Sequence, residues 1–198
     1  MNLSSVAMSQ VLHVGNNAFQ SCTSLSSINM PLLKHVGDLA FKYSTIGSIT
    51  TSQVTSVGAS AFEGSRLSSV NMPLLSHVGN EAFFSCPYLS SVTMAQVTSV
   101  GSSAFQFCHY LNSVSMPSLK SVGNNVFQFC YNLNSVTMTQ VTSVGSSAFR
   151  SCINLNSVSM TQVTSVGSSA FDSCPSLSTV NMPLLRSVGG SAFQYASL

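Results

Sequence analysis

The sequence predicts a repeat solenoid, a single domain over residues 1–198 in which nine short coils stack along one axis. The first observation is that one apolar motif recurs at intervals of 21 or 22 residues. The second is that each copy keeps the same order of apolar, glycine and phenylalanine positions. A fixed period of this length is the sequence signature of stacked repeats. The coils begin at Leu3, Leu25, Ile46, Leu67, Leu89, Leu111, Leu133, Leu155 and Leu177.

The first half of each coil predicts two short strands. Counting the first Leu or Ile as position 0, the pattern is L-x-x-V-x-M-x-x-V-x-x-V-G-x-x-A-F-x-x-C. Val at position 3 and Met at position 5 lie two residues apart, so they point to the same side of a strand, which we place inward. Valines at positions 8 and 11 bracket a second extended piece. Gly at position 12 predicts a corner where the backbone needs either a positive φ or a close approach.

The second half of each coil predicts a helical turn and the centre of the core. Paired Ser or Asn residues precede Ala-Phe, which suits the cap of a single helical turn. Phe recurs at position 16 in all nine coils, from Phe19 to Phe193. Because one coil cannot bury this face alone, stacked coils form a continuous core. We therefore interpret the Phe column as core and not as a ligand or cofactor box.

The segments SVxMPxL and SVGxxAF, with the Cys that follows, resemble the BspA-like leucine-rich repeats of bacterial and protist surface antigens. The resemblance covers Leu3 to Leu198. It implies a leucine-rich-repeat solenoid with a parallel β-sheet on its concave side and a short strand and helical turn on its convex side. It also implies protein binding or adhesion at a cell surface, and it supplies no catalytic residues. The chain departs from the usual pattern in its Met at position 5 and in one residue fewer before position 8.

Composition excludes several classes of function. Charged residues make up 5% of the chain, against about 25% in an ordinary globular protein. The net charge of +2 comes with no basic stripe for nucleic acid and no polybasic cluster for anionic lipid. No apolar run approaches the length of a membrane span, so we expect no membrane insertion. Met1 leads directly into the first repeat without a signal peptide, so an extracellular or cell-surface location rests on the resemblance alone.

The cysteines predict packing. All six lie at position 19, where neighbouring coils are about 5 Å apart, a distance that does not by itself exclude disulfides. Side chains in one column point the same way, which is poor geometry for a bridge. The small residues Ser44, Ser65 and Ala196 replace Cys in the three coils of 21 residues. We predict buried free thiols, with disulfide or metal use as the alternative. The six are Cys22, Cys86, Cys108, Cys130, Cys152 and Cys174.

No constellation of side chains predicts catalysis or a cofactor. His13 and His35 share one position in adjacent coils, but no carboxylate or thiol joins them, and zinc usually takes three or four protein ligands. The four carboxylates lie at different positions or in distant coils, and no Ser is singled out by a His and an acid. We therefore expect a protein that is not an enzyme and that carries no metal and no cofactor.

Two surfaces are candidate binding sites. The outward positions 2 and 4 of the first strand form a ladder of small hydroxyls, a polar face for protein or glycan or simply a solvated face. Side chains around positions 17 to 21 form an aromatic patch with His109, and aromatics are enriched at interaction hot spots; packing between coils is the alternative. The candidates are Phe84, Tyr88, Phe107, Tyr110, Phe129 and Tyr131 for the patch, and Ser91, Thr93, Ser113, Ser115, Ser135 and Thr137 for the polar face.

The two ends of the solenoid predict a third surface. Solenoids normally carry polar capping repeats, and none is visible here. The apolar burial forgone at each end rivals the whole stability of a domain, about 5–15 kcal/mol. Either the chain is a fragment of a longer solenoid, or copies stack head to tail into filaments. The residues for such a contact are Leu3, Val6, Met8, Val180, Met182, Val188, Phe193 and Leu198.

The sequence thus favours a non-enzymatic repeat protein for protein–protein interaction or cell-surface adhesion. The alternative is a structural subunit that assembles end to end into extracellular filaments. The expected partner is another protein or a copy of the same chain, and not nucleic acid.

Overall fold

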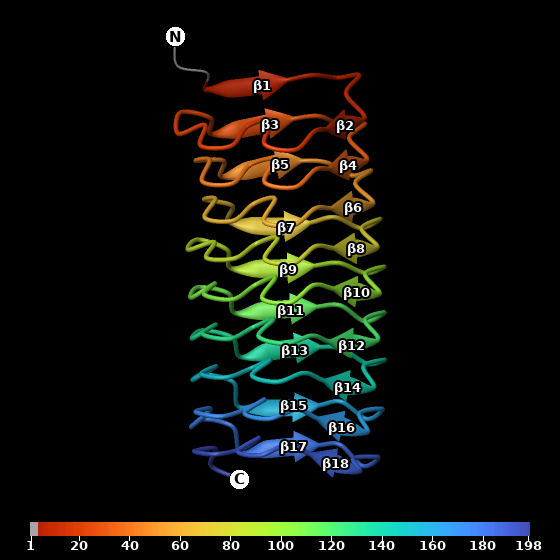
Figure 1. Ribbon diagram of the computed structural model, residues 1–198, viewed down its shortest axis with the longest axis vertical. Helices are drawn as coiled ribbons and strands as arrows, with labels where there is room; N and C mark the ends of the chain where they lie inside the picture. Colours follow the sequence, from red (N-terminus) through yellow and green to blue (C-terminus); the bar gives the residue numbers. More distant parts are fainter. Residues whose placement is uncertain (1–3) are drawn as a thin grey trace.

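A computed structural model describes residues 4–198 as a column of nine coils (Figure 1). Each coil contributes a strand of three residues and a strand of two residues, and the described residues form no helix. The three-residue strands are β1 (Ser5–Ala7), β3 (Ser27–Asn29), β5 (Ser48–Thr50), β7 (Ser69–Asn71), β9 (Ser91–Thr93), β11 (Ser113–Ser115), β13 (Ser135–Thr137), β15 (Ser157–Ser159) and β17 (Thr179–Asn181). The two-residue strands are β2 (His13–Val14), β4 (His35–Val36), β6 (Ser56–Val57), β8 (His77–Val78), β10 (Ser99–Val100), β12 (Ser121–Val122), β14 (Ser143–Val144), β16 (Ser165–Val166) and β18 (Ser187–Val188).

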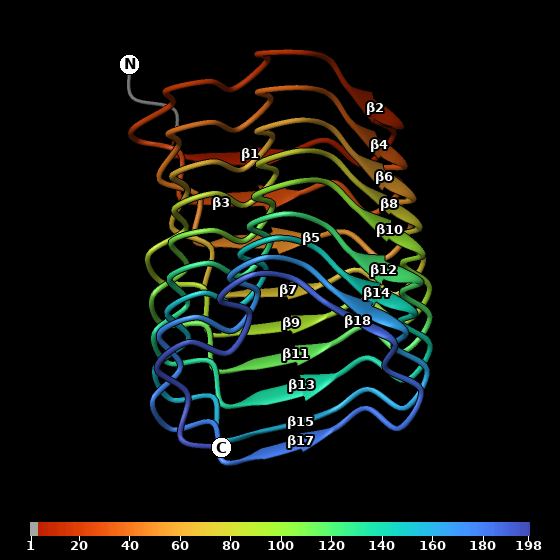
Figure 2. The ribbon, with the colours of Figure 1, turned by 60° about the horizontal axis from the view of Figure 1, so that its bottom comes forward.

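Strands of the same kind pair in parallel, coil upon coil. Ser113 of β11 pairs with Ser91 on one side and Ser135 on the other, so equal positions of neighbouring coils face each other. The long strands form the sheets β1-β3-β5, β7-β9-β11-β13 and β15-β17, and the short strands form β2-β4-β6-β8-β10 and β12-β14-β16-β18. Figure 2 shows the two kinds of strand as separate columns, with each coil closing around an interior. The predicted solenoid with a parallel sheet is confirmed.

The Phe column is the centre of the core, as predicted. Its seven inner rings, from Phe41 to Phe171, are fully buried, while Phe19 and Phe193 at the ends are partly buried. Successive rings stack with centroids 5.1–5.5 Å apart and planes within 18° of parallel. Aromatic pairs at such distances add stabilisation beyond their buried area. One ring from each coil therefore links all nine coils through a single apolar column.

The predicted helical turn is wrong, because this side of each coil bonds to the next coil instead. Asn125 and Phe129 have φ of 57° and 62°, and residues at the same two positions of every coil are also left-handed. A left-handed residue cannot continue a right-handed helix. The N–H groups of Asn125, Phe127 and Phe129 donate to carbonyls of the following coil at 3.0, 2.8 and 2.9 Å. We call this side the turn face, positions 13 to 20 of each coil.

The repeated glycines serve close approach between coils. A Cβ added at Gly101 would lie 2.4 Å from the backbone nitrogen of Asn80, and one at Gly189 would lie 2.4 Å from that of Ser168. Neither glycine has a positive φ. Gly15, in the first coil, has nothing within 4 Å. The sequence explains glycine at position 12 by either a positive φ or a close approach, and the close approach between coils is therefore the correct explanation.

Candidate functional site

The structure divides the predicted aromatic patch into two groups. The inner group packs against itself along the turn face and is partly buried except for Tyr131, which is 37% exposed. Phe107 stacks on Phe129 with centroids 4.8 Å apart and meets Phe84 edge-on at 5.4 Å. His109 stacks on Tyr131 at 4.7 Å. These contacts join consecutive coils, so the inner group stabilises the stack.

The outer group consists of Tyr88 and Tyr110, whose side chains are 54% and 62% exposed. Both occupy position 21 of adjacent coils, and both line a surface hollow of about 500 Å³. We call this hollow the Tyr–Asn groove. Its lining is completed by Ser90, Asn112, Asn132, Asn134 and Asn154.

The local sequence explains why these side chains reach solvent together. Leu111 and Leu133, at position 0, are fully buried. Their neighbours at positions 21 and 1 therefore point outward on both sides and form two parallel columns. The backbone beneath is fixed by coil-to-coil bonds, from Asn112 N to the Ser90 carbonyl at 2.9 Å and from Asn134 N to the Asn112 carbonyl at 3.0 Å. The groove is thus a rigid surface that runs along the solenoid axis.

The amides of the groove fall into two sets. Asn132 donates from Nδ2 to the His109 carbonyl at 2.8 Å, and Asn154 donates from Nδ2 to Asn132 Oδ1 at 3.2 Å. Among the hydrogen bonds of residues 4–198, none uses the side chain of Asn112 or Asn134. Each of these two amides has one acceptor and two donor hydrogens available for a ligand.

The groove carries no charge, since all seven lining residues are neutral. Charges pair elsewhere: Lys42 Nζ lies 2.8 Å from Glu63 Oε2, the Tyr43 hydroxyl donates to Glu63 Oε1 at 2.9 Å, and Arg150 lies 3.1 Å from Asp172. Burial raises the pKa of the Glu63 carboxyl, but hydrogen bonds from Lys42 and Tyr43 outweigh burial and hold that pKa below its usual value. The same bond to Glu63 raises the pKa of Lys42. Lys42, Tyr43 and Glu63 thus form a structural ion-pair cluster that lies outside the groove.

The Asn residues of the groove were missed by sequence reasoning, although a signal exists. In two coils the sequence reads Asn-Leu-Asn, at Asn132-Leu133-Asn134 and Asn154-Leu155-Asn156. A polar residue on each side of a buried Leu marks a pair of outward columns. The aromatic residues are visible in the sequence because they break the repeat, whereas Asn residues are typical of any solvated surface.

The parallel strands hold the residues of the predicted polar face in the expected register. Ser91, Ser113 and Ser135 pair side by side, as do Thr93, Ser115 and Thr137. All six are exposed or partly buried. Their use in binding stays a prediction.

The predicted end residues have mixed exposure, and Leu3 lies outside the described residues. Met8 is 43% exposed, Val188 53% and Leu198 64%, whereas Val6 and Met182 are buried. Val180 and Phe193 are partly buried. The buried members are therefore covered by their own coil and its neighbour, while Met8, Val188 and Leu198 leave apolar surface exposed at the two ends.

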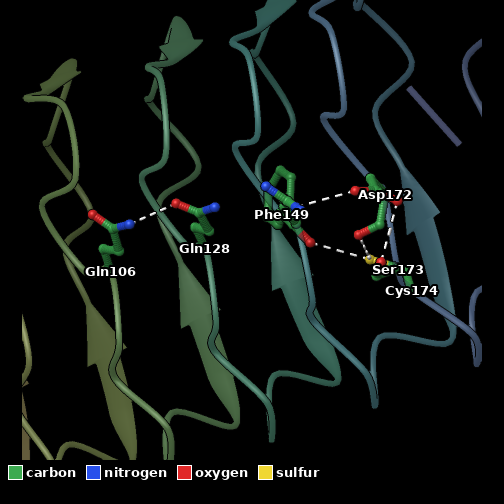
Figure 3. A network of polar contacts seen from close by, with 7 residues as sticks. Gln106, Gln128, Phe149, Asp172, Ser173 and Cys174 are labelled. Carbon is green, nitrogen blue, oxygen red and sulfur yellow. Dashed lines mark hydrogen bonds and ion pairs between the residues drawn. The ribbon is translucent and has the colours of Figure 1, made fainter. Parts of the chain in front are cut away.

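The cysteines have free thiols, and all except Cys22 are buried. Figure 3 shows Cys174 donating to the carbonyl of Phe149, at 3.1 Å, beside the bond from Gln106 Nε2 to Gln128 Oε1 at 2.5 Å. The buried Cys thiol thus bonds back to the preceding coil. Burial raises the pKa of Cys174 to about 12 and that of Cys130 further. Since the thiolate is the nucleophile, these groups are suited to packing and not to chemistry.

The histidines are also used between coils. His13 and His35 stack with centroids 4.9 Å apart, and His35 Nδ1 lies 2.7 Å from Ser56 Oγ. His77 makes the same contact with Ser99 at 2.7 Å. In the part of the chain that the structure describes, no three His, Cys, Asp or Glu side chains gather in a way that would hold a metal ion. A second hollow, of about 600 Å³, lies over the glycine column near Gly37, Gly58 and Gly79. Its lining also includes Asp38, Ser56 and His77.

No helix in the described residues is long and apolar enough to span a membrane.

The fold and the repeated columns define a leucine-rich-repeat solenoid. Within that class, the chain belongs to the BspA-type leucine-rich repeat family, whose repeat region, in six copies, matches residues 1–96 and 76–198. Comparison with curated proteins finds no match to this sequence.

Two solved structures share the architecture. A leucine-rich repeat protein of T. pallidum is 26% identical, with a TM-score of 0.71 over 78% of this chain and 79% of that one. The pneumococcal vaccine antigen PcpA is 12% identical, with a TM-score of 0.52 over 95% of this chain and 68% of that one. The second likeness shows the fold alone.

Proposed function

We propose that this chain is a non-enzymatic adhesion module that acts at a cell surface and binds its partner through the Tyr–Asn groove. The observation that carries the proposal is the pair of exposed rings, Tyr88 and Tyr110, at one edge of a hollow that spans several coils. Tyr is enriched among the residues that dominate binding energy. The membership of the BspA-type family, a repeat family compatible with surface and interaction roles, supports the same function.

The described titratable groups serve contacts between coils, which supports binding over catalysis. The titratable side chains are paired, as in Lys42–Glu63, or stacked, as in His13–His35. Catalysis needs a unique, preorganised constellation in a pocket. The larger hollow is lined by Ser56 and His77, but their bonds to His35 and Ser99 are the same contact repeated between coils and not a unique constellation.

Adhesion is tested with beads that carry the purified chain on monolayers of cultured epithelial cells. Beads with the unaltered chain should adhere above albumin-coated beads, and beads with the double variant Tyr88→Ala/Tyr110→Ala should not. Tyr195→Ala is the matched control, because Tyr195 is 72% exposed and lies outside the groove. Adhesion at the albumin level by the unaltered chain would refute the function, and equal adhesion by the groove variant would refute the site.

A second candidate is end-to-end assembly of chains of these 198 residues into filaments. Ser169, Phe171 and Ser173 donate N–H bonds to the ninth coil at 2.9, 2.7 and 2.8 Å. The equivalent Ser191 and Tyr195 keep the same left-handed backbone, so that coil repeats the donor geometry that another first coil would match. Exposed Val188 and Leu198 at one end, and Met8 at the other, would be covered by such a contact.

Sedimentation at several concentrations, with electron microscopy, tests this candidate. Filaments with one axial repeat per nine coils would support it, and Val188→Lys should then abolish them. Ile153→Lys is the control, because Ile153 is 42% exposed in the middle of the column. A monomer at every concentration would exclude assembly.

A further inference from the structure

We propose that the ligand of the Tyr–Asn groove is a neutral oligosaccharide that lies along the solenoid axis. The inference deepens the proposed function, on which it rests, by assigning the chemical class of the ligand. It is carried by the charge, the ring exposure, the free amides and the repeat spacing of the groove.

The charge of the groove selects a neutral ligand. All seven lining residues are uncharged. Recognition of a sulfate, phosphate or carboxylate group uses Arg or Lys, whose charged hydrogen bonds are the strong ones. The lining offers only hydroxyls, amides and two aromatic rings, which match a ligand made of hydroxyl groups and apolar C–H faces.

The exposed rings supply the apolar half of such a site. Tyr88 and Tyr110 occupy the same position in adjacent coils, where the strand spacing is about 4.8 Å. Neither ring belongs to the stacked inner group of Phe107, Phe129 and Tyr131. Each therefore keeps a face for the C–H surface of a sugar ring and a hydroxyl that can donate or accept a hydrogen bond.

The amides supply the polar half. Asn112 and Asn134 lie one coil apart at position 1, beside the Tyr column, and neither uses its side chain in a hydrogen bond among residues 4–198. An amide offers a donor and an acceptor side by side, and neighbouring sugar hydroxyls offer the same pair in return. The volume of about 500 Å³ lies within the usual range of ligand sites, about 300–1,000 Å³.

The repeat itself favours a ligand that also repeats. Each column repeats a side chain in adjacent coils, Tyr88 with Tyr110 and Asn112 with Asn134, so successive units of a polysaccharide meet similar groups. A peptide would gain most by adding to a strand edge. The backbone under the groove is already committed between coils, from Asn112 N to Ser90 and from Asn134 N to Asn112. Binding must therefore use side chains, which suits a sugar better than an extended peptide.

The test is an array of neutral oligosaccharides built from glucose, galactose, mannose, xylose and N-acetylglucosamine, with sialylated and sulfated chains for comparison. The full chain should bind at least one neutral series, with little dependence on salt. Tyr88→Ala/Tyr110→Ala and Asn112→Asp/Asn134→Asp should each lower affinity by about tenfold or more, as for hot-spot residues. Asn29→Asp/Asn71→Asp is the matched control, since it makes the same charge change at exposed strand residues outside the groove.

Binding to no neutral oligosaccharide would overturn the inference. A preference for sialylated or sulfated chains that salt abolishes would also overturn it, as would full affinity in both groove variants. Bead adhesion to cells whose surface sugars have been oxidised with periodate distinguishes the adhesion function from the proposed sugar ligand. Groove-dependent adhesion that survives oxidation would keep the adhesion function and discard the sugar, whereas loss of adhesion on oxidation supports both.

Discussion

Positions 16 and 18 of each coil lie two residues apart on the same turn, yet they differ in how strictly the sequence is kept. Position 16 is Phe in all nine coils. Position 18 is left-handed in all nine coils but holds Ser, Tyr, Gly or Phe. The backbone conformation at position 18 is therefore constant although its side chain varies. Only the side chain that faces the interior is fixed, because the closed coil leaves room there for one ring per turn.

The contrast between constant interior side chains and variable surface side chains separates stability from recognition. Phe107 and Phe129 hold left-handed backbone with bulky side chains, which is uncommon for residues other than Gly, Asn and Asp. Their mutual stacking offsets that conformational cost. The outer column that begins with Tyr88 and Tyr110 changes to Asn without disturbing the coil beneath. Variation is thus concentrated where a partner can make contact.

The largest expected effect on stability comes from removing a ring of the Phe column. Phe127→Ala removes a fully buried ring from the stack and should lower the free energy of unfolding by about 3–5 kcal/mol. Phe129→Ala removes a ring of the same size from the partly buried position 18 and should cost clearly less. Urea unfolding followed by circular dichroism measures both. Equal losses would show that the two positions contribute alike to the core.

A smaller loss is expected from the glycine column. Gly101→Ala forces a Cβ against the backbone of the preceding coil and should cost about 1–3 kcal/mol, as for other overpacked sites. Gly15→Ala is the control, because nothing lies within 4 Å of its added Cβ. The same unfolding measurement applies, and a comparable loss in both variants would contradict close approach as the reason for glycine.

A pH-dependent contribution of about 1 kcal/mol or less is expected from Glu63. Its folded pKa lies below the unfolded value, so the stabilisation is present above the usual Glu pKa of about 4.3 and is lost as pH falls through the folded pKa. Glu63→Gln should therefore be less stable than the unaltered chain near neutrality. The difference should shrink below about pH 4 in urea titrations at several pH values. A difference that is constant with pH would exclude the carboxylate as its cause.

The smallest effect on stability is expected at the outer column. Tyr88→Ala/Tyr110→Ala removes exposed rings and should change the free energy of unfolding by about 0.5 kcal/mol or less per site. Thermal unfolding of this variant beside Phe127→Ala sharpens the contrast between outer and inner positions. A loss of several kcal/mol would mean that the Tyr side chains belong to the core and would remove the basis of the groove variants as binding tests.

Much of the fold followed from periodicity, while much of the candidate site did not. The strands, the Phe core and the glycine contacts are visible as columns in the sequence, because each coil repeats the same packing problem. The local capping pattern before Ala-Phe, considered alone, predicts a helical turn. The structure replaces it with hydrogen bonds to the next coil, and a local reading cannot include a partner that lies 21 or 22 residues away.

The candidate site shows the same division. Tyr88 and Tyr110 stood out because they interrupt a repeat, but nothing in the sequence separated them from Phe107 and Phe129. Burial made that separation: the Phe pair stacks between coils, and the Tyr pair remains exposed. Asn112 and Asn134 became part of the site only when stacking placed their column beside the Tyr column.

The sequence by itself determined the number of coils, their register and the residues that fill the interior, because a fixed period places equal side chains in equal environments. Only the tertiary structure decided which glycines touch backbone, which aromatics are covered and where a hollow opens. Those properties depend on distances between coils, and each coil acquires its surface only when its neighbours are in place.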